Sequence, residues 1–110
     1  DDAWRDYERA RGHKLPEALK GEAAWHVFEF DLKWLKKADA VVLMMPAGKS
    51  AFMELGWSLG RGKPGFILLD ADPERYDVMF RFATGVASSI EELLRMMRQG
   101  VARRESCVSA

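Results

Sequence analysis

The sequence predicts an α/β fold built on a parallel sheet. Two apolar runs, residues 40–45 and 65–69, have the length of buried strands, and a turn or loop follows each of them. Segments with helical periodicity precede the first run, separate the two runs and close the chain. Because strands that alternate with helices are joined by right-handed crossovers, they form a parallel sheet with helices on its faces.

Composition indicates a single small globular domain. Of the 110 residues, 48% are hydrophobic, and 17 basic side chains balance 17 acidic ones. We therefore expect one domain over residues 1–100, a disordered polar tail over 101–110, and no partner among polymeric nucleic acids or membranes. The lone Cys107 cannot form an intrachain disulfide, and neither a secretory leader nor a long apolar run is found, so we expect a cytoplasmic protein.

The first half of the chain predicts helices. Residues 1–21 mix charged residues with glycine and proline, which is typical of short helical turns and loop. Residues 22–38 have a clear helical period. The apolar stripe of this helix, which we expect to be buried, consists of Trp25, Phe28, Leu32 and Leu35.

The second half predicts the elements that complete the fold. Residues 51–61 have helical period, and Gly56 and Gly60 within them allow close approach to a sheet. We then expect a turn at Asp70–Pro73, a short helix within 74–82 and a short third strand at 84–87.

A final helix is predicted after residue 87. Ser88 and Glu91 have the spacing of a capping box, and Gly100 suits the C-terminal end of this helix. Its expected buried stripe consists of Ile90, Leu93, Leu94 and Met97.

Residues 46–50, Pro-Ala-Gly-Lys-Ser, contain part of a phosphate-binding loop. Such a loop needs a second glycine five residues before the glycine of Gly-Lys-Ser, and that position holds Leu43 inside a strand. We therefore expect no hydrolysis of nucleoside triphosphates. Gly48, Lys49 and Ser50 are still candidates for contact with a phosphate or hydroxyl, because the free N–H groups of a helix start favour anions. The alternative is that Ser50 only caps the helix.

Glu54 is the first of two candidate catalytic carboxylates. It lies about one turn inside the predicted helix, where the dipole favours an ionised carboxylate, and one position too late for a capping box with Ser50. An ionised carboxylate at the ligand edge of a sheet can act as a nucleophile or stabilise developing positive charge. The alternative is that Glu54, Ser58 and Arg61 form an ordinary solvated face.

Asp31 is the second candidate. A carboxyl group in apolar surroundings holds its proton, which suits it to deliver a proton during a reaction. An ionised group beside a protonated one is what cleavage at an anomeric carbon requires. The alternative is an edge position with the Asp31 carboxylate in solvent or in a structural hydrogen bond. Its helical neighbours three and four positions away are Val27, Phe28, Trp34 and Leu35.

The segment DLKWLKKADAVVLMMPAGKSAFMELGWSLGRGKP, residues 31–64, carries several motifs together. They are an Asp-Leu helix, an Ala-Asp before an apolar strand, a small-residue loop, and Glu-Leu-Gly followed by an aromatic residue and a Gly-Lys-Pro turn. In these features the chain resembles the nucleoside 2-deoxyribosyltransferase-like proteins. The resemblance continues more weakly through residues 78–94, so that it covers roughly residues 22–97.

The resemblance implies a Rossmann/flavodoxin-like three-layer sandwich and cleavage or transfer of the N-glycosidic bond of a nucleoside or nucleotide, without a metal or organic cofactor. It implies that Glu54 is the nucleophile, that Asp31 takes part in base binding and proton transfer, and that Ser50 contacts the sugar or a phosphate. It also implies a homo-oligomer whose neighbouring subunits complete the pocket. The family begins with a further strand; because no apolar run precedes residue 40, we predict that this chain lacks that strand.

Two other functions stay open. One is a nucleotide-binding module without turnover, and the other is a nucleoside monophosphate phosphoribohydrolase in which Lys49 favours a phosphorylated substrate. Trp57 is a candidate wall of a base pocket, although packing in the core explains it as well. His13 and His26 have no partners at metal-ligand spacing, so we expect ordinary surface roles for them and no metal site.

Overall fold

The computed structural model describes residues 2–109, and it describes the side chains of residues 2–99. Its contacts divide the chain into two compact units, Asp1–Lys37 and Ala38–Ala110, where the sequence predicts one domain over residues 1–100. The division arises because the long helix that ends at Lys37 packs with the N-terminal helix, whereas the strands pack with the helices that follow them in the chain.

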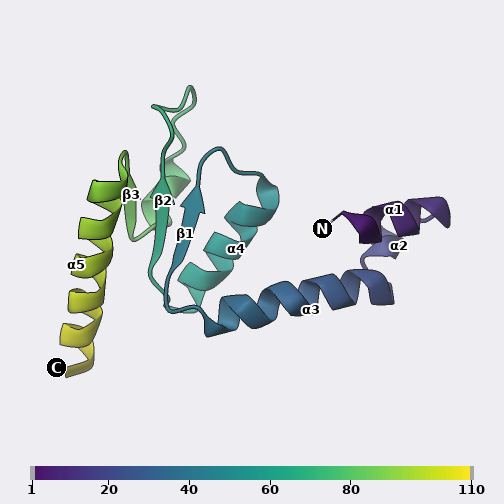
Figure 1. Ribbon diagram of the computed structural model, residues 1–110, viewed down its shortest axis with the longest axis horizontal. Coiled ribbons are helices and arrows are strands. Elements are labelled where there is room, and N and C mark those ends of the chain that lie inside the picture. Colours follow the sequence, from purple (N-terminus) through teal and green to yellow (C-terminus); the bar gives the residue numbers. More distant parts are fainter. Residues whose placement is uncertain (1, 110) are drawn as a thin grey trace. The chain divides into compact units, whose positions relative to one another are not determined.

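The first unit contains helices separated by tight turns, as the sequence predicts. They are α1 (Ala3–Ala10), α2 (Leu15–Ala18) and α3 (Glu22–Lys37), labelled in Figure 1. The predicted helix over residues 22–38 is therefore confirmed to within one residue.

The turn after α1 is a Schellman motif. Gly12 has a φ of 77°, a left-handed conformation that glycine adopts without strain. The N–H of Gly12 donates to the carbonyl of Arg9 at 2.9 Å, and the N–H of His13 donates to the carbonyl of Glu8 at 3.0 Å. These two bonds end the helix and bring the side chain of His13 back over its last turn.

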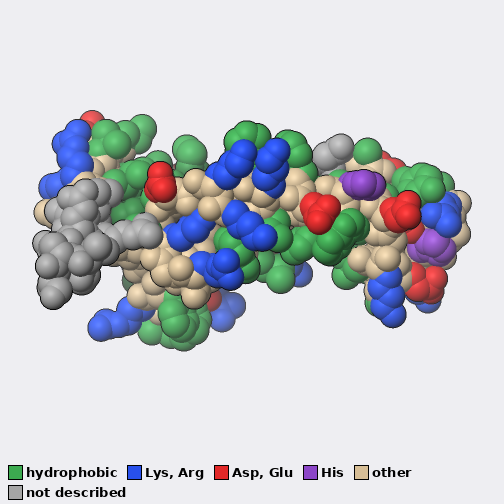
Figure 2. All heavy atoms as spheres, turned by 90° about the horizontal axis from the view of Figure 1, so that it is seen from below, with side chains coloured by type: hydrophobic (Ala, Val, Ile, Leu, Met, Phe, Trp, Pro, Cys, Tyr) green, Lys and Arg blue, Asp and Glu red, His purple; other side chains and the backbone are tan. Residues whose placement is uncertain are grey.

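The burial predicted for α3 is only partly correct: Leu32 and Leu35 of the expected stripe are half-buried, but its aromatic residues are not buried. Trp25 and Phe28, expected on a buried stripe, are each 56% exposed, and small Ala24 is the buried residue of this helix. The reason is that large apolar side chains surround the helix: Phe30 and Trp34, on other sides of it, are exposed as well. Figure 2 shows one face of the molecule, on which hydrophobic side chains reach the surface among charged ones.

The second unit is built on a parallel sheet, which confirms the predicted fold class. Its strands are β1 (Val41–Met44), β2 (Gly65–Leu68) and β3 (Gly85–Ala87), in the spatial order β1-β2-β3. Val41 pairs with Gly65, and Phe66 pairs with Gly85. All three strands are therefore parallel, and their carboxyl ends lie at one edge of the sheet.

Helices cover both faces of this sheet, which makes it the middle layer of three. Leu43 of β1 and Ile67 of β2 pack with Leu55 of helix α4 (Lys49–Gly60) on one face. On the other face Phe66 and Ala87 pack with Leu93 of helix α5 (Ile90–Ser109). Figure 1 shows the strands between α4 and α5. The two clusters come from alternate residues of the strands, as the pleat of a strand requires.

Two helix starts differ from the predictions. Gly48, in an extended conformation, is the residue before α4, so Ser50 lies inside the first turn and is not the N-cap. At α5 the capping residues are Ser89 and Glu92 in place of Ser88 and Glu91: Ser89 Oγ accepts from the N–H of Glu92 at 3.2 Å. The side chain of Glu92 in turn accepts from the N–H of Ser88 at 3.3 Å. The spacing was predicted correctly, but the helix begins one residue later.

The end and the buried stripe of α5 also differ from the predictions. The backbone of α5 continues past Gly100, where the sequence predicts its end. Leu93 is buried and Met97 half-buried, but Ile90 and Leu94 are exposed, because Met96 takes the place beside Met97 in the core. The side chains of residues 101–110 lie outside the described part of the chain, so the predicted disorder of this segment stays a prediction.

Gly56 and Gly60 were predicted to let their helix approach the sheet closely, but a different glycine has this role. Both residues are exposed, and a Cβ placed on either would meet no atom within 4 Å. By contrast, a Cβ on Gly65 would lie 2.6 Å from Leu55 Cδ1 and 2.9 Å from Leu59 Cδ2. It is the strand glycine that lets α4 lie against the sheet.

The connection between β2 and β3 is not a full helix. The short helix predicted within residues 74–82 is a 3₁₀ turn, η1 (Val78–Phe82), started by Asp77, whose Oδ1 accepts from the N–H of Met79 at 2.9 Å. A crossover between parallel strands usually carries an α-helix. Here α4 shares its face of the sheet with this shorter segment and not with a second α-helix.

Candidate functional site

The loop that follows β1 lies at the ligand edge predicted from topology. It runs from Met45 to Gly48 and leads from the carboxyl end of β1 into α4. Lys49 and Ser50 form the start of that helix, and Gly48, Lys49 and Ser50 are all exposed. The three predicted loop residues therefore stand together at the edge of the sheet where ligands of parallel α/β proteins bind.

Glu54 is half-buried on α4, about a turn and a half beyond the helix start. Among residues 2–99 its carboxylate forms no ion pair and no side-chain hydrogen bond. The alternative of an ordinary solvated face does not hold, because Ser58, one turn further along, is completely buried. Its Oγ has no hydrogen-bond partner in the described part of the chain.

Asp31 lies on α3 in the first unit and is exposed. Its neighbours Phe28 and Trp34 are exposed too, so the apolar side of the helix does not enclose the carboxyl group as predicted. Asp31 and Glu54 belong to different compact units. Their cooperation stays a prediction.

Trp57 is half-buried, and two cationic side chains lie near its indole ring. The guanidinium carbon of Arg61 is 5.1 Å from the centroid of the indole ring, and the ammonium of Lys63 is 5.8 Å from it. Both distances fall within the range of cation–π attraction. Trp57 therefore packs with the basic side chains at the end of α4.

The second unit contains a groove of about 1090 Å³ on the side of α4 that faces away from Glu54. Its lining includes Phe52, Gly56 and Leu59 of α4, Ile67 of β2 and Phe80 of η1. Since successive residues turn by about 100° around a helix, Glu54 stands about 200° from both Phe52 and Gly56. The groove is consequently separated from Glu54 by the body of the helix.

None of the predicted site residues lines this groove. Phe52 and Leu59 pack partly in the core, and the sequence indicated no role for Phe80 or Arg75. The sequence did contain one indication of the groove: the segment between the second and third strands lacks the periodicity of a full α-helix. A crossover without a helix leaves part of the neighbouring helix and sheet uncovered.

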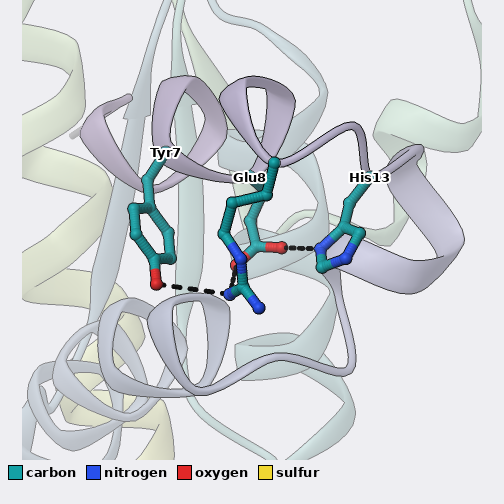
Figure 3. A network of polar contacts seen from close by, with 4 residues as sticks. Tyr7, Glu8 and His13 are labelled. Carbon is teal, nitrogen blue, oxygen red and sulfur yellow. Dashed lines mark hydrogen bonds and ion pairs between the residues drawn. The ribbon is translucent and has the colours of Figure 1, made fainter.

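The first unit holds a polar network around a buried carboxylate (Figure 3). Glu8 is buried, and its Oε2 lies 2.5 Å from Nδ1 of His13. Arg11 Nη1 is 3.7 Å from Oε1 of Glu8 and donates to the hydroxyl of Tyr7 at 3.2 Å. This network borders a cleft of about 710 Å³, which His26 also lines.

The ordinary surface role predicted for His13 is therefore wrong. Its ring is held by Glu8 because the Schellman turn at Gly12 directs residue 13 back along α1. The ring nitrogen that does not bind Glu8 points away from it (Figure 3). Gly12 in the sequence was the signal for this turn, although the partner of His13 was not evident.

No group of three or more His, Cys, Asp or Glu side chains in the described part of the chain is arranged to hold a metal ion. Among the described helices, none combines the length and apolar character needed to span a bilayer. Comparison of the chain with models of protein families, with curated proteins and with solved structures finds no match. Fold and site geometry therefore define the class: an α/β protein with a parallel sheet and a helix start at its carboxyl edge.

Proposed function

We propose that the protein cleaves or transfers the N-glycosidic bond of a nucleoside or nucleotide, with Glu54 as the nucleophile. The proposal rests on the resemblance of residues 31–64 to the nucleoside 2-deoxyribosyltransferase-like proteins. The observation that supports it most is the position of Glu54. This carboxylate has no ion-pair partner among the described side chains, is half-buried, and follows the loop at the carboxyl edge of the sheet.

The proposed reaction has two steps at the C1′ atom of the sugar: transfer of the sugar to the enzyme, and its release. The carboxylate of Glu54 forms a bond to C1′ while the bond to the base nitrogen breaks, and the base leaves with a proton delivered by Asp31. Water then hydrolyses the sugar ester, or a second base takes the sugar. The first outcome is hydrolase activity and the second is transferase activity.

Base exchange tests the proposal directly. The protein is incubated with a deoxynucleoside and a second free base, and the products are separated by chromatography. We expect released base or a new nucleoside, and a loss of at least about a thousandfold in Glu54→Gln and Glu54→Ala. Glu91→Gln, at an exposed carboxylate in the first turn of α5, is the matched control.

Either of two results would refute the assignment. One is that no base is released or exchanged with any deoxynucleoside or nucleoside monophosphate. The other is activity in Glu54→Gln equal to that of the unchanged chain.

A nucleotide-binding module without turnover is the second candidate. The exposure of Asp31 favours it, since an acid that delivers a proton is generally shielded from water. Under this alternative, calorimetry measures nucleotide binding that is weakened in Lys49→Ala and Ser50→Ala, and no base is released. Dependence of catalysis on a 5′-phosphate, together with a raised KM in Lys49→Ala, would instead identify a phosphoribohydrolase.

We propose that two or more copies of the chain associate. Both β1 and β3 are edge strands of the described sheet, and Met44 on β1 is exposed together with the aromatic side chains of α3. Sedimentation or light scattering measures the molar mass. A molar mass of one chain at all accessible concentrations would contradict association. A cytoplasmic location and the lack of membrane or nucleic-acid partners also stay proposals, which rest on composition.

A further inference from the structure

The groove beside α4 exists because η1 replaces a crossover helix. The 3₁₀ turn has five residues, and several of its large side chains do not reach the core: Phe82 is 74% exposed, and Val78 and Met79 are exposed as well. Phe80 is the residue of this turn that packs against the core cluster. A largely apolar groove between α4 and η1 remains.

The walls of the groove suit a flat apolar body. The rings of Phe52 and Phe80 lie 5.6 Å apart at an interplanar angle of 32°, and Ile67 of the central strand also lines the groove. Gly56 lies on the α4 wall, and nothing stands within 4 Å of the position that a Cβ would take there. A planar ring system can therefore lie against the aromatic pair and the glycine.

The charges that border the groove favour an anion. Arg75 and Lys63 line it together with one carboxylate, that of Asp77. An oxygen of Asp77 is already taken by the N–H of Met79, and the hydroxyl of Thr84 accepts from the N–H of Gly65 at 3.0 Å. Within the described residues Arg75 forms no ion pair or side-chain hydrogen bond, so its guanidinium is available to a ligand.

We propose that this groove binds a small molecule with a flat, largely apolar body and a single anionic group, a carboxylate, sulfonate or phosphate. The body lies against the rings of Phe52 and Phe80, and the anionic group faces Arg75. The volume of about 1090 Å³ slightly exceeds the range of roughly 300–1,000 Å³ for small-molecule sites, so the groove has room for such a ligand. Because the groove and Glu54 stand on different sides of α4, this site is independent of the proposed N-glycosidic activity.

A pair of dyes with matched ring systems tests the proposal on the full chain. The anionic dye is 8-anilinonaphthalene-1-sulfonate, and the neutral dye is N-phenyl-1-naphthylamine. We expect both to bind at one site per chain, with the anionic dye the tighter by about two- to fivefold, the size expected for one exposed charge pair. Arg75→Gln should abolish that difference, whereas Arg98→Gln, at an exposed arginine of α5, should preserve it.

Gly56→Leu adds a bulky side chain to the α4 wall of the groove, at a position where a Cβ meets no atom within 4 Å. We expect both dyes to bind it at least about tenfold more weakly. Arg98→Leu is the control for an added leucine on the other face of the sheet. Near-ultraviolet circular dichroism of each variant shows whether it has kept native packing, which matters because loosely packed states also bind such dyes.

Three results would overturn the proposal. The first is equal affinity for the anionic and neutral dyes in the unchanged chain. The second is a natively packed Gly56→Leu variant with unchanged dye binding. The third is dye binding that falls as chains associate, which would show that a second copy covers the groove. Loss of base exchange in Glu54→Gln with intact dye binding would separate the two sites.

Discussion

The Nδ1 atom of His13 lies 2.5 Å from the Oε2 atom of Glu8, a carboxylate whose side chain is only 3% exposed. This pair joins the two sides of the Schellman turn after α1. A buried carboxylate without such a partner would be costly, because its loss of hydration would not be compensated. The pair is therefore a structural element of the first unit, and Arg11 supports it from the surface.

His13→Ala should destabilise the first unit by about 1–3 kcal/mol, since it leaves a buried acceptor without its closest donor. Hydrogen exchange of the α1 amides is the appropriate measurement, because it reports this unit separately from the sheet. His26→Ala, at an exposed histidine of α3 that borders the same cleft, should have little effect. Equal protection of α1 in His13→Ala and the unchanged chain would show that the contact contributes nothing.

Gly65→Ala should destabilise the sheet unit by about 1–3 kcal/mol. The new methyl group would press on Leu55 and Leu59, both of which pack in the core cluster, so that α4 would have to shift. Gly56→Ala should instead stabilise α4 by up to about 1 kcal/mol, since it adds helix propensity in open space. Urea unfolding followed by circular dichroism compares the two. A Gly65→Ala chain as stable as the Gly56→Ala chain would contradict the close packing of helix and strand.

Ser58→Ala should leave the protein at least as stable, and we expect a gain of about 1 kcal/mol. The hydroxyl is fully buried and without a partner among the described residues, so its removal relieves an uncompensated loss of hydration. Ser50→Ala, at an exposed position of the same helix, is the comparison and should change stability by less than about 0.5 kcal/mol. Thermal unfolding measures both variants. A clear loss of stability in Ser58→Ala would mean that the hydroxyl has a hydrogen-bond partner in solution.

Tyr76 should lose its proton at higher pH than an ordinary tyrosine. Its hydroxyl donates to Asp72 Oδ2 at 2.6 Å, and this hydrogen bond, followed by the charge of the carboxylate, raises the pKa of Tyr76. Both favour the protonated phenol, so Asp72→Asn should lower the pKa of Tyr76 toward its usual value of 10.0. Ultraviolet titration in a Tyr7→Phe background follows Tyr76 alone, because the chain has two tyrosines. Coincident titration curves with and without Asp72 would refute the contact.

Local sequence chemistry accounts well for the existence of the elements and less well for their edges. The apolar runs that became β1 and β2 and the periodic segments that became α3, α4 and α5 were predicted because periodicity and length are properties of neighbouring residues. The start of α5 moved by one residue, from Ser88 to Ser89. The two adjacent serines have the same capping chemistry, so local sequence does not distinguish them, and in the structure Ser89 is the cap.

For the candidate site, the sequence located the loop after β1, but neither the residue at which α4 begins nor the groove. Glu54 was predicted to be an ionised carboxylate at the ligand edge of the sheet, and the groove of the second unit lies on the other side of its helix. Phe80 and Arg75 come from the irregular crossover, where no period shows which side chains turn inward. Asp31 was predicted from its apolar neighbours, yet those neighbours are themselves exposed.

The sequence by itself determined the alternation of strands and helices, the parallel sheet that this alternation implies, and the place of Gly48, Lys49 and Ser50 after the carboxyl end of β1. Only the tertiary structure shows which side of α4 borders the groove and which glycine lets this helix pack closely on the sheet. Only the tertiary structure shows that His13 contacts the buried carboxylate of Glu8. The physical reason is that periodicity arises from contacts within one segment. Cavities and buried pairs depend on how the side chains of several segments, including short irregular ones, fill the space between them.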